Sequence, residues 1–233
     1  MLQDGYYIVH DFLSKDEHSH LLDVSRTVYE DAQFNKKNGA DDPSYAWDDN
    51  GQLNKIESAC LFHPAFKNLA SNPILVQTAK KLLNTSESLD CYISKFFPMQ
   101  PHTGTSTFMH QDNFYFNGDN KKILSCAVYL TDTNKQNGCL RLAKGSHTKG
   151  ILKHEVSSDV NKYIKWIDNK ELECYDIMDL EFRGPYAVFF DINMVHGCYP
   201  NKSDDFRYSL AWEYIESSNT DVVDWYDDRI KLY

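Results

Sequence analysis

The sequence lacks any apolar run that approaches the roughly 20 residues needed to cross a membrane. Its opening, MLQDGYYIVHDF, has neither the basic start nor the long apolar stretch of a secretory signal. The six cysteines are scattered and form no CxxC pair, which argues against a zinc knuckle or a thioredoxin-like motif. We therefore expect a cytoplasmic protein with reduced thiols and no membrane partner.

Positive charge is also scarce. The chain has 24 Lys and Arg residues against 34 Asp and Glu residues, a formal net charge of −10. Such a chain is repelled by phosphate backbones and by anionic lipid, so we expect no nucleic-acid partner. The same balance favours a small or cationic substrate over a CoA thioester. A monomer or weak dimer is our default expectation.

Internal repeats, low-complexity tracts and an obvious linker are absent, so the 233 residues predict one domain. In the first third, Ser14 and Glu17 form an S-x-x-E capping box, which predicts a helix over residues 15–29. A second helical zone is predicted over residues 63–83, with an interruption near Asn72-Pro73.

After residue 89 the pattern changes to strands and turns. Helices first and strands later predict a mainly β barrel or sandwich with helices packed outside. We place the helical part at about residues 1–90 and the β-core at about 91–215. Residues 35–54 are polar and turn-rich, which suits either a lid over a site or a plain surface loop. A first strand is predicted over residues 5–9, and the strands of the β-core over residues 92–97, 106–112, 123–130, 139–143, 185–197 and 207–215.

Two potential metal ligands stand two residues apart in FMHQDNFYF, residues 108–116. In a strand, residues i and i+2 share a face, so His110 and Asp112 are predicted to point the same way. Two histidines and one carboxylate can bind Fe(II) on one face and leave positions open. We predict His196 as the third ligand, because it ends the apolar run AVFFDINMVH just before Gly197.

Arg207 opens the next strand, RYSLAWEYI. Alternation places Arg207 and Ser209 on one face of that strand. A guanidinium binds a carboxylate through two parallel hydrogen bonds, and a neighbouring hydroxyl can add a third. This pair would suit the far carboxylate of 2-oxoglutarate, whose keto-acid end chelates iron.

Three motifs resemble, in the same order, those of the phytanoyl-CoA dioxygenase family of Fe(II)/2-oxoglutarate-dependent oxygenases. The opening DGYYIVHDFLS is also similar, so the resemblance runs over most of the chain. It implies a double-stranded β-helix core of the jelly-roll or cupin-like type. The motifs are HQD at 110–112, NGCLRLAKGSH at 137–147 and VHGCYPNKSDDFRYS at 195–209.

The resemblance also implies roles for individual residues. Its iron ligands would be His110, Asp112 and His196. The co-substrate would be bound by Arg207, with Ser209 assisting.

Two further co-substrate contacts are implied more loosely: Gln111, inside the HQD motif, and Lys55, in LNKIESACLFHP. The chain departs from the family pattern at two places. Cys198 stands where the family often has serine, and Ala143-Lys144 replaces a small apolar residue followed by proline.

The implied activity is that of a hydroxylase-type dioxygenase. It would use Fe(II), 2-oxoglutarate and O₂ to oxidise an unactivated C–H bond of a small metabolite or natural-product intermediate, releasing succinate and CO₂. Asp112 favours hydroxylation, because related halogenases carry a small residue there. Desaturation or cyclisation would use the same triad. A non-catalytic binding module of the same fold is the rival from another class. A zinc hydrolase with the same three ligands is a further alternative, but it would give Arg207 and Ser209 no role in binding or catalysis.

Overall fold

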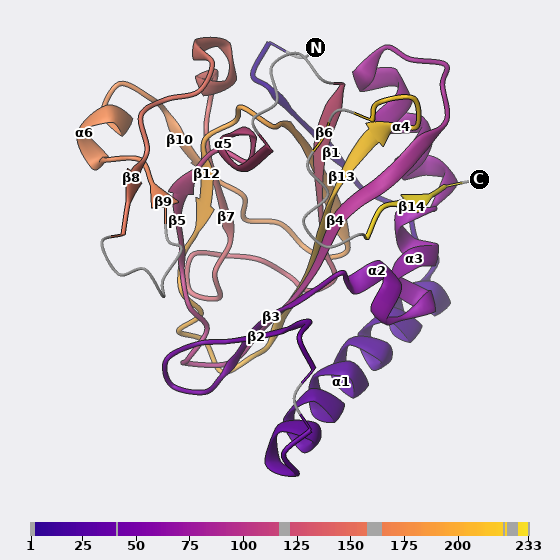
Figure 1. Cartoon of the computed structure of the whole chain (residues 1–233). Helices are drawn as coiled ribbons and strands as arrows, with labels where there is room; N and C mark the ends of the chain where they lie inside the picture. The colour runs from indigo at the N-terminus through magenta and orange to yellow at the C-terminus, as the bar shows by residue number, and fades with distance from the viewer. Residues whose placement is uncertain are drawn as a thin grey trace.

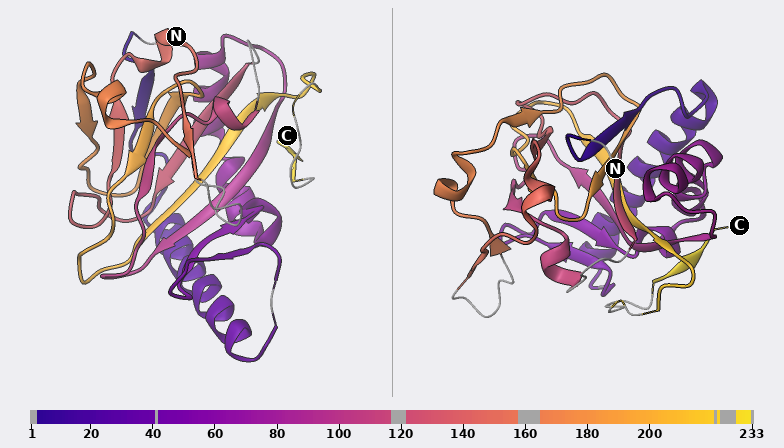
Figure 2. Two further views of the ribbon diagram at one scale, coloured as in Figure 1. Left: turned by 60° about the vertical axis from the view of Figure 1, so that its left-hand side comes forward. Right: turned by 90° about the horizontal axis from the view of Figure 1, so that it is seen from above.

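The computed structural model of the chain describes residues 3–40, 42–116, 122–157, 165–220, 222 and 228–232. Two antiparallel β-sheets face each other, and helices cover the outer side of the larger sheet (Figure 1). The side and top views in Figure 2 show the same layers. No helix in this part of the chain combines the length and apolar character of a membrane span.

The first long helix begins where the capping box predicts. Ser14 Oγ accepts a hydrogen bond from the Glu17 backbone, and the Glu17 carboxylate accepts one from the Ser14 N–H at 2.8 Å. This helix, α1, ends at Lys37 rather than at residue 29, so it takes up the start of the segment that we predicted to be a loop. The other helices are α2 (Ala59–Phe62), α3 (Pro64–Ala70), α4 (Pro73–Leu83), α5 (Asn113–Phe116), the 3₁₀ turn η1 (Ser146–Lys149) and α6 (Asn169–Leu172).

The larger sheet has the order β1-β11-β6-β13-β4-β3-β2, with β14 paired to β4. Three of its strands come from the first 90 residues, so the predicted helical part also contributes to the sheet. Its strands are β1 (Tyr6–Val9), β2 (Tyr45–Trp47), β3 (Leu53–Glu57), β4 (Leu89–Met99), β6 (Ile123–Tyr129), β11 (Tyr186–Asp191), β13 (Arg207–Glu216) and β14 (Ile230–Lys231).

The smaller sheet has the order β10-β7-β12-β5. A separate two-stranded ribbon, β8-β9, lies between β7 and β10 in the sequence, and residues 158–164 between its strands lie outside the described residues. The strands of the smaller sheet are β5 (Thr107–His110), β7 (Leu140–Ala143), β10 (Ile177–Asp179) and β12 (His196–Cys198), and the ribbon is β8 (Glu155–Val156) with β9 (Lys165–Trp166).

Alternation along β13 separates two environments. Leu210, Trp212 and Tyr214 are buried in the core between the larger sheet and the helices. The residues between them face the space between the two sheets. Part of that space is filled by a second apolar cluster, whose buried members include Leu142, Leu180, Tyr186, Val188, Phe190 and Met194.

The prediction of one strand over residues 185–197 is wrong. The chain leaves the larger sheet after Asp191 and enters the smaller one at His196. A turn makes the crossing, because Asp191 Oδ1 accepts from the Asn193 N–H at 2.8 Å and the Asp191 carbonyl accepts from the Met194 N–H at 2.7 Å. Likewise, the strand predicted over residues 106–112 already ends at His110.

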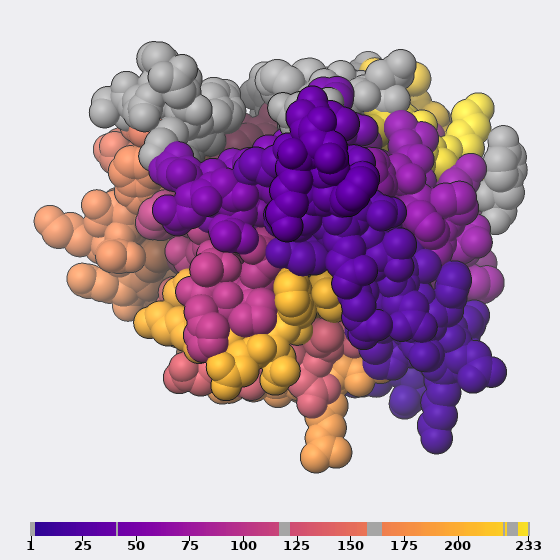
Figure 3. Space-filling view, turned by 90° about the horizontal axis from the view of Figure 1, so that it is seen from below, coloured from indigo at the N-terminus to yellow at the C-terminus, as the bar shows by residue number. Residues whose placement is uncertain are grey.

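The loop predicted over residues 35–54 is shorter than expected. Residues 35–37 belong to the last turn of α1, and residues 45–47 form β2, which pairs with β3. Residue 41 lies outside the described residues. Seen from below, the indigo and purple N-terminal part of the chain forms one part of the surface, next to magenta and amber segments from later in the chain (Figure 3).

Candidate metal centre

Three potential ligands converge between the sheets. The Nε2 atoms of His110 and His196 each lie 3.6 Å from Asp112 Oδ1. The two imidazole centroids are 4.3 Å apart, and the ligand atoms of all three residues lie within 4.8 Å of one another. The structure thus brings the three predicted ligands together at a spacing that could hold one metal ion. Their binding of iron stays a prediction.

Strand pairing explains how the two histidines meet. β5 and β12 are antiparallel neighbours, and His110 is the direct cross-strand partner of His196. Opposed residues of paired strands share a face, so both rings project to the same side. Asp112 follows the end of β5, in the turn that leads into α5. The turn, and not strand alternation, therefore brings its carboxylate to the histidines.

Backbone and hydroxyl contacts orient the three ligands. Nδ1 of His110 lies 2.8 Å from the Phe108 carbonyl, and Nδ1 of His196 lies 3.0 Å from the Met194 carbonyl. Because a carbonyl can only accept, each Nδ1 carries the proton and each Nε2 keeps a free lone pair. This leaves both Nε2 atoms ready to bind a cation.

The carboxylate is held in a similar way. Ser125 on β6 donates to Asp112 Oδ2 at 2.8 Å, which leaves Oδ1 facing the histidines. Burial alone would raise the pKa of Asp112, but His196 and His110 hold that pKa below its usual value. Burial lowers the pKa of His196 to about 4, against the opposing effect of Asp112. At neutral pH the site therefore offers an anion and a neutral imidazole, the forms that bind metals.

Arg207 is a buried cation without a carboxylate partner. It is 3% exposed, its Nη1 donates to Ser209 Oγ at 3.2 Å, and its Nε has no hydrogen-bond partner. Its guanidinium carbon lies 5.2 Å from the centre of the Tyr129 ring. Among the described residues, no Asp or Glu oxygen lies within the 4.0 Å of an ion pair with it. A buried charge in this condition is costly unless an anion binds beside it.

A cleft connects this guanidinium with the strands that carry the histidines. Its lining includes Arg207 from β13, Thr107 from β5 and Cys198 from β12. Asp48 and residues 52–54 border the same cleft. The second half of the segment 35–54 therefore lies at the site, and its movement as a lid stays a prediction.

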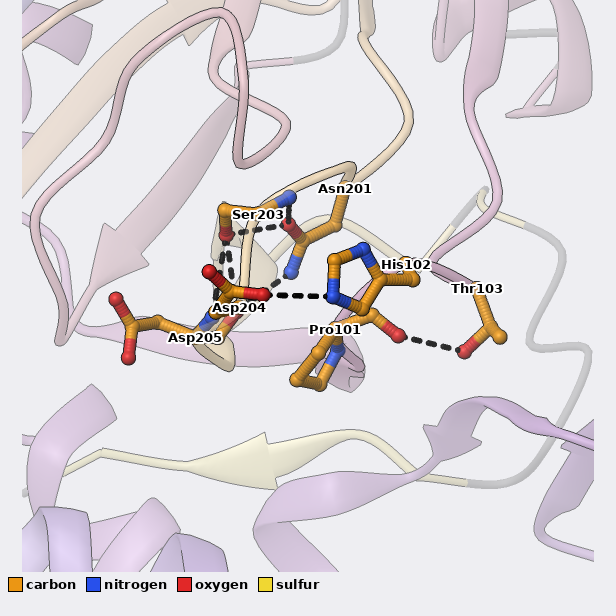
Figure 4. A network of polar contacts seen from close by, with 7 residues as sticks. All are labelled: Pro101, His102, Thr103, Asn201, Ser203, Asp204 and Asp205. Carbon is orange, nitrogen blue, oxygen red and sulfur yellow. Dashed lines mark hydrogen bonds and ion pairs between the residues drawn. The ribbon is translucent and has the colours of Figure 1, made fainter.

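The turn before Arg207 is fixed by a buried amide. Asn201 is 1% exposed, and its Nδ2 donates to the carbonyls of Met99 at 3.2 Å and Asp205 at 2.8 Å. Figure 4 shows Asn201 with its neighbours Ser203 and Asp205, together with the exposed hydrogen bond between His102 and Asp204. These bonds fix the chain between β12 and β13, and so set where Arg207 begins its strand.

The two remaining co-substrate candidates have other partners. Gln111 Nε2 donates to the carbonyls of Gly150 at 2.8 Å and Asn193 at 2.6 Å, and its Oε1 accepts from the Leu152 N–H at 2.7 Å. Both amide hydrogens are thus used, so Gln111 ties loops together and has no donor left for a co-substrate.

Lys55 forms an ion pair with Glu57 on the same strand. Its side chain is 29% exposed. Contact between Lys55 and a co-substrate stays a prediction.

Sequence reasoning missed several supporting residues. Ser125 could have been noticed as a hydroxyl inside the buried run ILSCAVYL. Ser146 of the GSH motif accepts from the Val195 N–H at 2.8 Å and so holds the residue before His196. His154 is a third such residue: it is 8% exposed and accepts from the Gln111 N–H at 3.1 Å.

Comparison with known proteins agrees with this architecture. The profile of the phytanoyl-CoA dioxygenase (PhyH) family matches residues 1–209. A Danio rerio protein, phytanoyl-CoA dioxygenase domain-containing protein 1, is 29% identical over 175 residues, covering 72% of this chain and 59% of its own length. The ectoine dioxygenase of Bordetella bronchiseptica is 24% identical over 246 residues, covering 94% and 74%. The chain spans about half the length of some curated relatives, since a Dictyostelium discoideum homologue is covered to 43%.

A solved structure shows the fold. EctD from S. alaskensis, crystallised with 2-oxoglutarate and 5-hydroxyectoine, superposes with a TM-score of 0.76 at 21% identity. The match covers 93% of this chain and 74% of EctD. The predicted mainly β fold with a double-stranded β-helix core is therefore confirmed.

Proposed function

The chain belongs to the phytanoyl-CoA dioxygenase family, and on that premise we propose that it is an Fe(II)- and 2-oxoglutarate-dependent oxygenase of a small molecule. One observation carries the proposal. The His110, Asp112 and His196 side chains converge, and the strands that carry the two histidines also line a cleft with the buried Arg207. The Arg207 guanidinium has no carboxylate partner among the described residues. A metal site alone would suit many reactions, and the added anion site narrows them.

The donor set fits ferrous iron. Two imidazole nitrogens and one carboxylate oxygen on one face would hold the ion and leave its other positions open. Iron bound there, with 2-oxoglutarate and O₂, supplies oxidation of a C–H bond with release of succinate and CO₂. The chain itself orients the ligands. The Phe108 and Met194 carbonyls fix the rings, and Ser125 fixes the carboxylate.

Arg207 would bind the far carboxylate of 2-oxoglutarate. Its Nε lacks a partner, and Ser209 lies beside its Nη1, so a carboxylate could accept from both side chains. Burial strengthens this interaction, because the low dielectric inside the protein weakens screening by water. The related EctD, at 21% identity, was crystallised with 2-oxoglutarate, which supports this choice of anion.

Hydroxylation is the outcome we propose for the substrate. Asp112 is present and its Oδ1 faces both histidines, so the acid retains the ligand position that a halogenase would leave open. Desaturation and cyclisation need the same ligands and are the alternatives.

The test is succinate release. The protein, supplied with Fe(II), 2-oxoglutarate and O₂, is screened against a panel of small metabolites, and each product is identified by mass. We expect a substrate-dependent increase in succinate together with a product heavier by one oxygen atom. A product lighter by two hydrogens would replace hydroxylation with desaturation or ring closure. Succinate release that does not require His196 would contradict the proposed function.

A further inference from the structure

A second set of charged side chains faces the metal centre and has no task in the function proposed above. Glu213 lies on β13, and its cross-strand partner on β6 is Ser125, the residue that donates to Asp112. Paired residues on antiparallel strands share a face. Glu213 therefore faces the same space between the sheets as the three metal ligands.

One oxygen of the buried Glu213 carboxyl group has no partner. The residue is 3% exposed, and its Oε2 is enclosed and makes no hydrogen bond. Among the described residues, no Lys or Arg nitrogen lies within ion-pair distance of it. Proteins seldom keep a carboxylate in this condition unless something binds it, because removal from water must be compensated.

The surroundings of Glu213 are predominantly acidic. Three carboxylates, Asp112, Asp228 and Glu57, act on it electrostatically, against one lysine, Lys95. Glu57 is itself buried; it forms an ion pair with Lys55, while its Oε2 lacks a hydrogen bond. Burial, and then these carboxylates, raise the pKa of Glu213, and a cation bound beside Glu213 would stabilise its ionised form.

The position of Glu213 relative to Arg207 separates two binding regions. Both residues lie on the inner face of β13, about 20 Å apart by the rise of an extended strand. The metal cluster lies beside Ser125, at the Glu213 end. The co-substrate carboxylate would thus occupy one end and leave the Glu213 end to the substrate. Solvent reaches this interior at the metal cluster, where the His110 and Asp112 side chains each keep 13% exposure.

We propose that Glu213 binds a positively charged nitrogen group of the substrate, an ammonium, amidinium or guanidinium, and so places a neighbouring C–H bond at the metal. This inference rests on the proposed function, because it takes the metal cluster as the reaction centre. It makes Glu213 a specificity-determining residue, and it defines the substrate class as small cationic or zwitterionic molecules.

The test compares matched ligands on matched variants. Protein loaded anaerobically with Fe(II) and 2-oxoglutarate is titrated by calorimetry with n-butylammonium, n-butylguanidinium and the neutral n-butanol. In the wild type we expect at least one cation to bind roughly 10-fold or more tightly than the alcohol. Glu213→Gln should weaken the binding of that cation roughly 10- to 100-fold and leave the binding of the alcohol unchanged.

Two further variants complete the test. Glu216→Gln makes the same substitution on the same strand, at a residue that pairs with Lys122 instead, and should keep the wild-type preference. Glu213→Asp keeps the charge and should retain a reduced preference, which separates charge from folding effects.

An equal preference for cations in wild type and Glu213→Gln, or no preference in the wild type, would overturn the assignment. A wild type that binds cations through Glu213 but releases no succinate with any substrate would contradict the proposed function alone.

Discussion

The space between the two sheets has two unlike halves. The half bounded by β11, β7 and β10 is filled with apolar side chains, including Leu142, Leu180, Tyr186, Val188 and Phe190. The half bounded by β13, β3, β5 and β12 carries the three metal ligands, a guanidinium and two carboxylates with unpartnered oxygens. Apolar burial stabilises the fold, whereas buried charges without partners cost stability. The comparison indicates that the second half is shaped for ligands.

Removing a metal ligand should have the largest effect. In Asp112→Ala the site loses its only anion among the three ligands, so we expect succinate release to fall to background. Folding should persist, because the apolar half is untouched. Activity and thermal unfolding of the same preparation check both statements. Substantial remaining turnover in Asp112→Ala would contradict the assignment of catalysis to the half that carries the three potential metal ligands.

Arg207→Met should weaken the binding of 2-oxoglutarate without lowering the stability of the fold. Loss of a buried charge partner costs about 2–5 kcal/mol, so we expect the KM for 2-oxoglutarate to rise roughly 100-fold. Without 2-oxoglutarate the unfolding temperature should stay level or rise, because an unpaired buried charge is removed. Arg183→Met, at an exposed arginine, is the matched control. A drop in stability with an unchanged KM would assign Arg207 to the fold.

Leu180→Ala should lower the stability of the fold without weakening the binding of 2-oxoglutarate. Leu180 is fully buried in the apolar half, and truncation of such a leucine costs about 2–5 kcal/mol of unfolding free energy. The KM for 2-oxoglutarate should stay near its wild-type value. Leu61→Ala, at a residue 58% exposed, should change stability by about 0.5 kcal/mol or less. Denaturant unfolding measures both variants, and equal losses would contradict the packing described.

Ser125→Ala should have the smallest effect of the four. Ser125 is not one of the three potential ligands, but its hydroxyl fixes Asp112 Oδ2, and removal of such a supporting group typically weakens metal binding about 10-fold or more. Iron titration of the apoprotein would show the change. Unaltered iron affinity would mean that the turn alone orients Asp112.

Sequence reasoning identified the three side chains that converge as potential metal ligands, but not every structural feature that brings them together. The capping box, the motif order and the Arg207–Ser209 face depend on local rules, and these features lie where predicted. The crossing after Asp191 depends on long-range pairing with two different strands, which local alternation does not reveal. That is why residues 185–197 read as one strand.

Strand alternation alone could have placed Glu213 on the inner face of β13. The prediction named only Arg207 and Ser209 on the inner face of β13, although the same period of two continues to Glu213 without a break against β6. Its burial, however, depends on the neighbouring strands and could not be read from the sequence. The environment of His154 was missed for the same reason, since its partner Gln111 is distant along the chain.

The most direct test of the central claim is the visible absorption of the protein mixed anaerobically with Fe(II) and 2-oxoglutarate. If His110, Asp112 and His196 hold iron beside Arg207, a weak charge-transfer band should appear with one iron per chain and be lost in His196→Ala. Folded wild-type protein that binds iron but gives no band with 2-oxoglutarate would contradict the account.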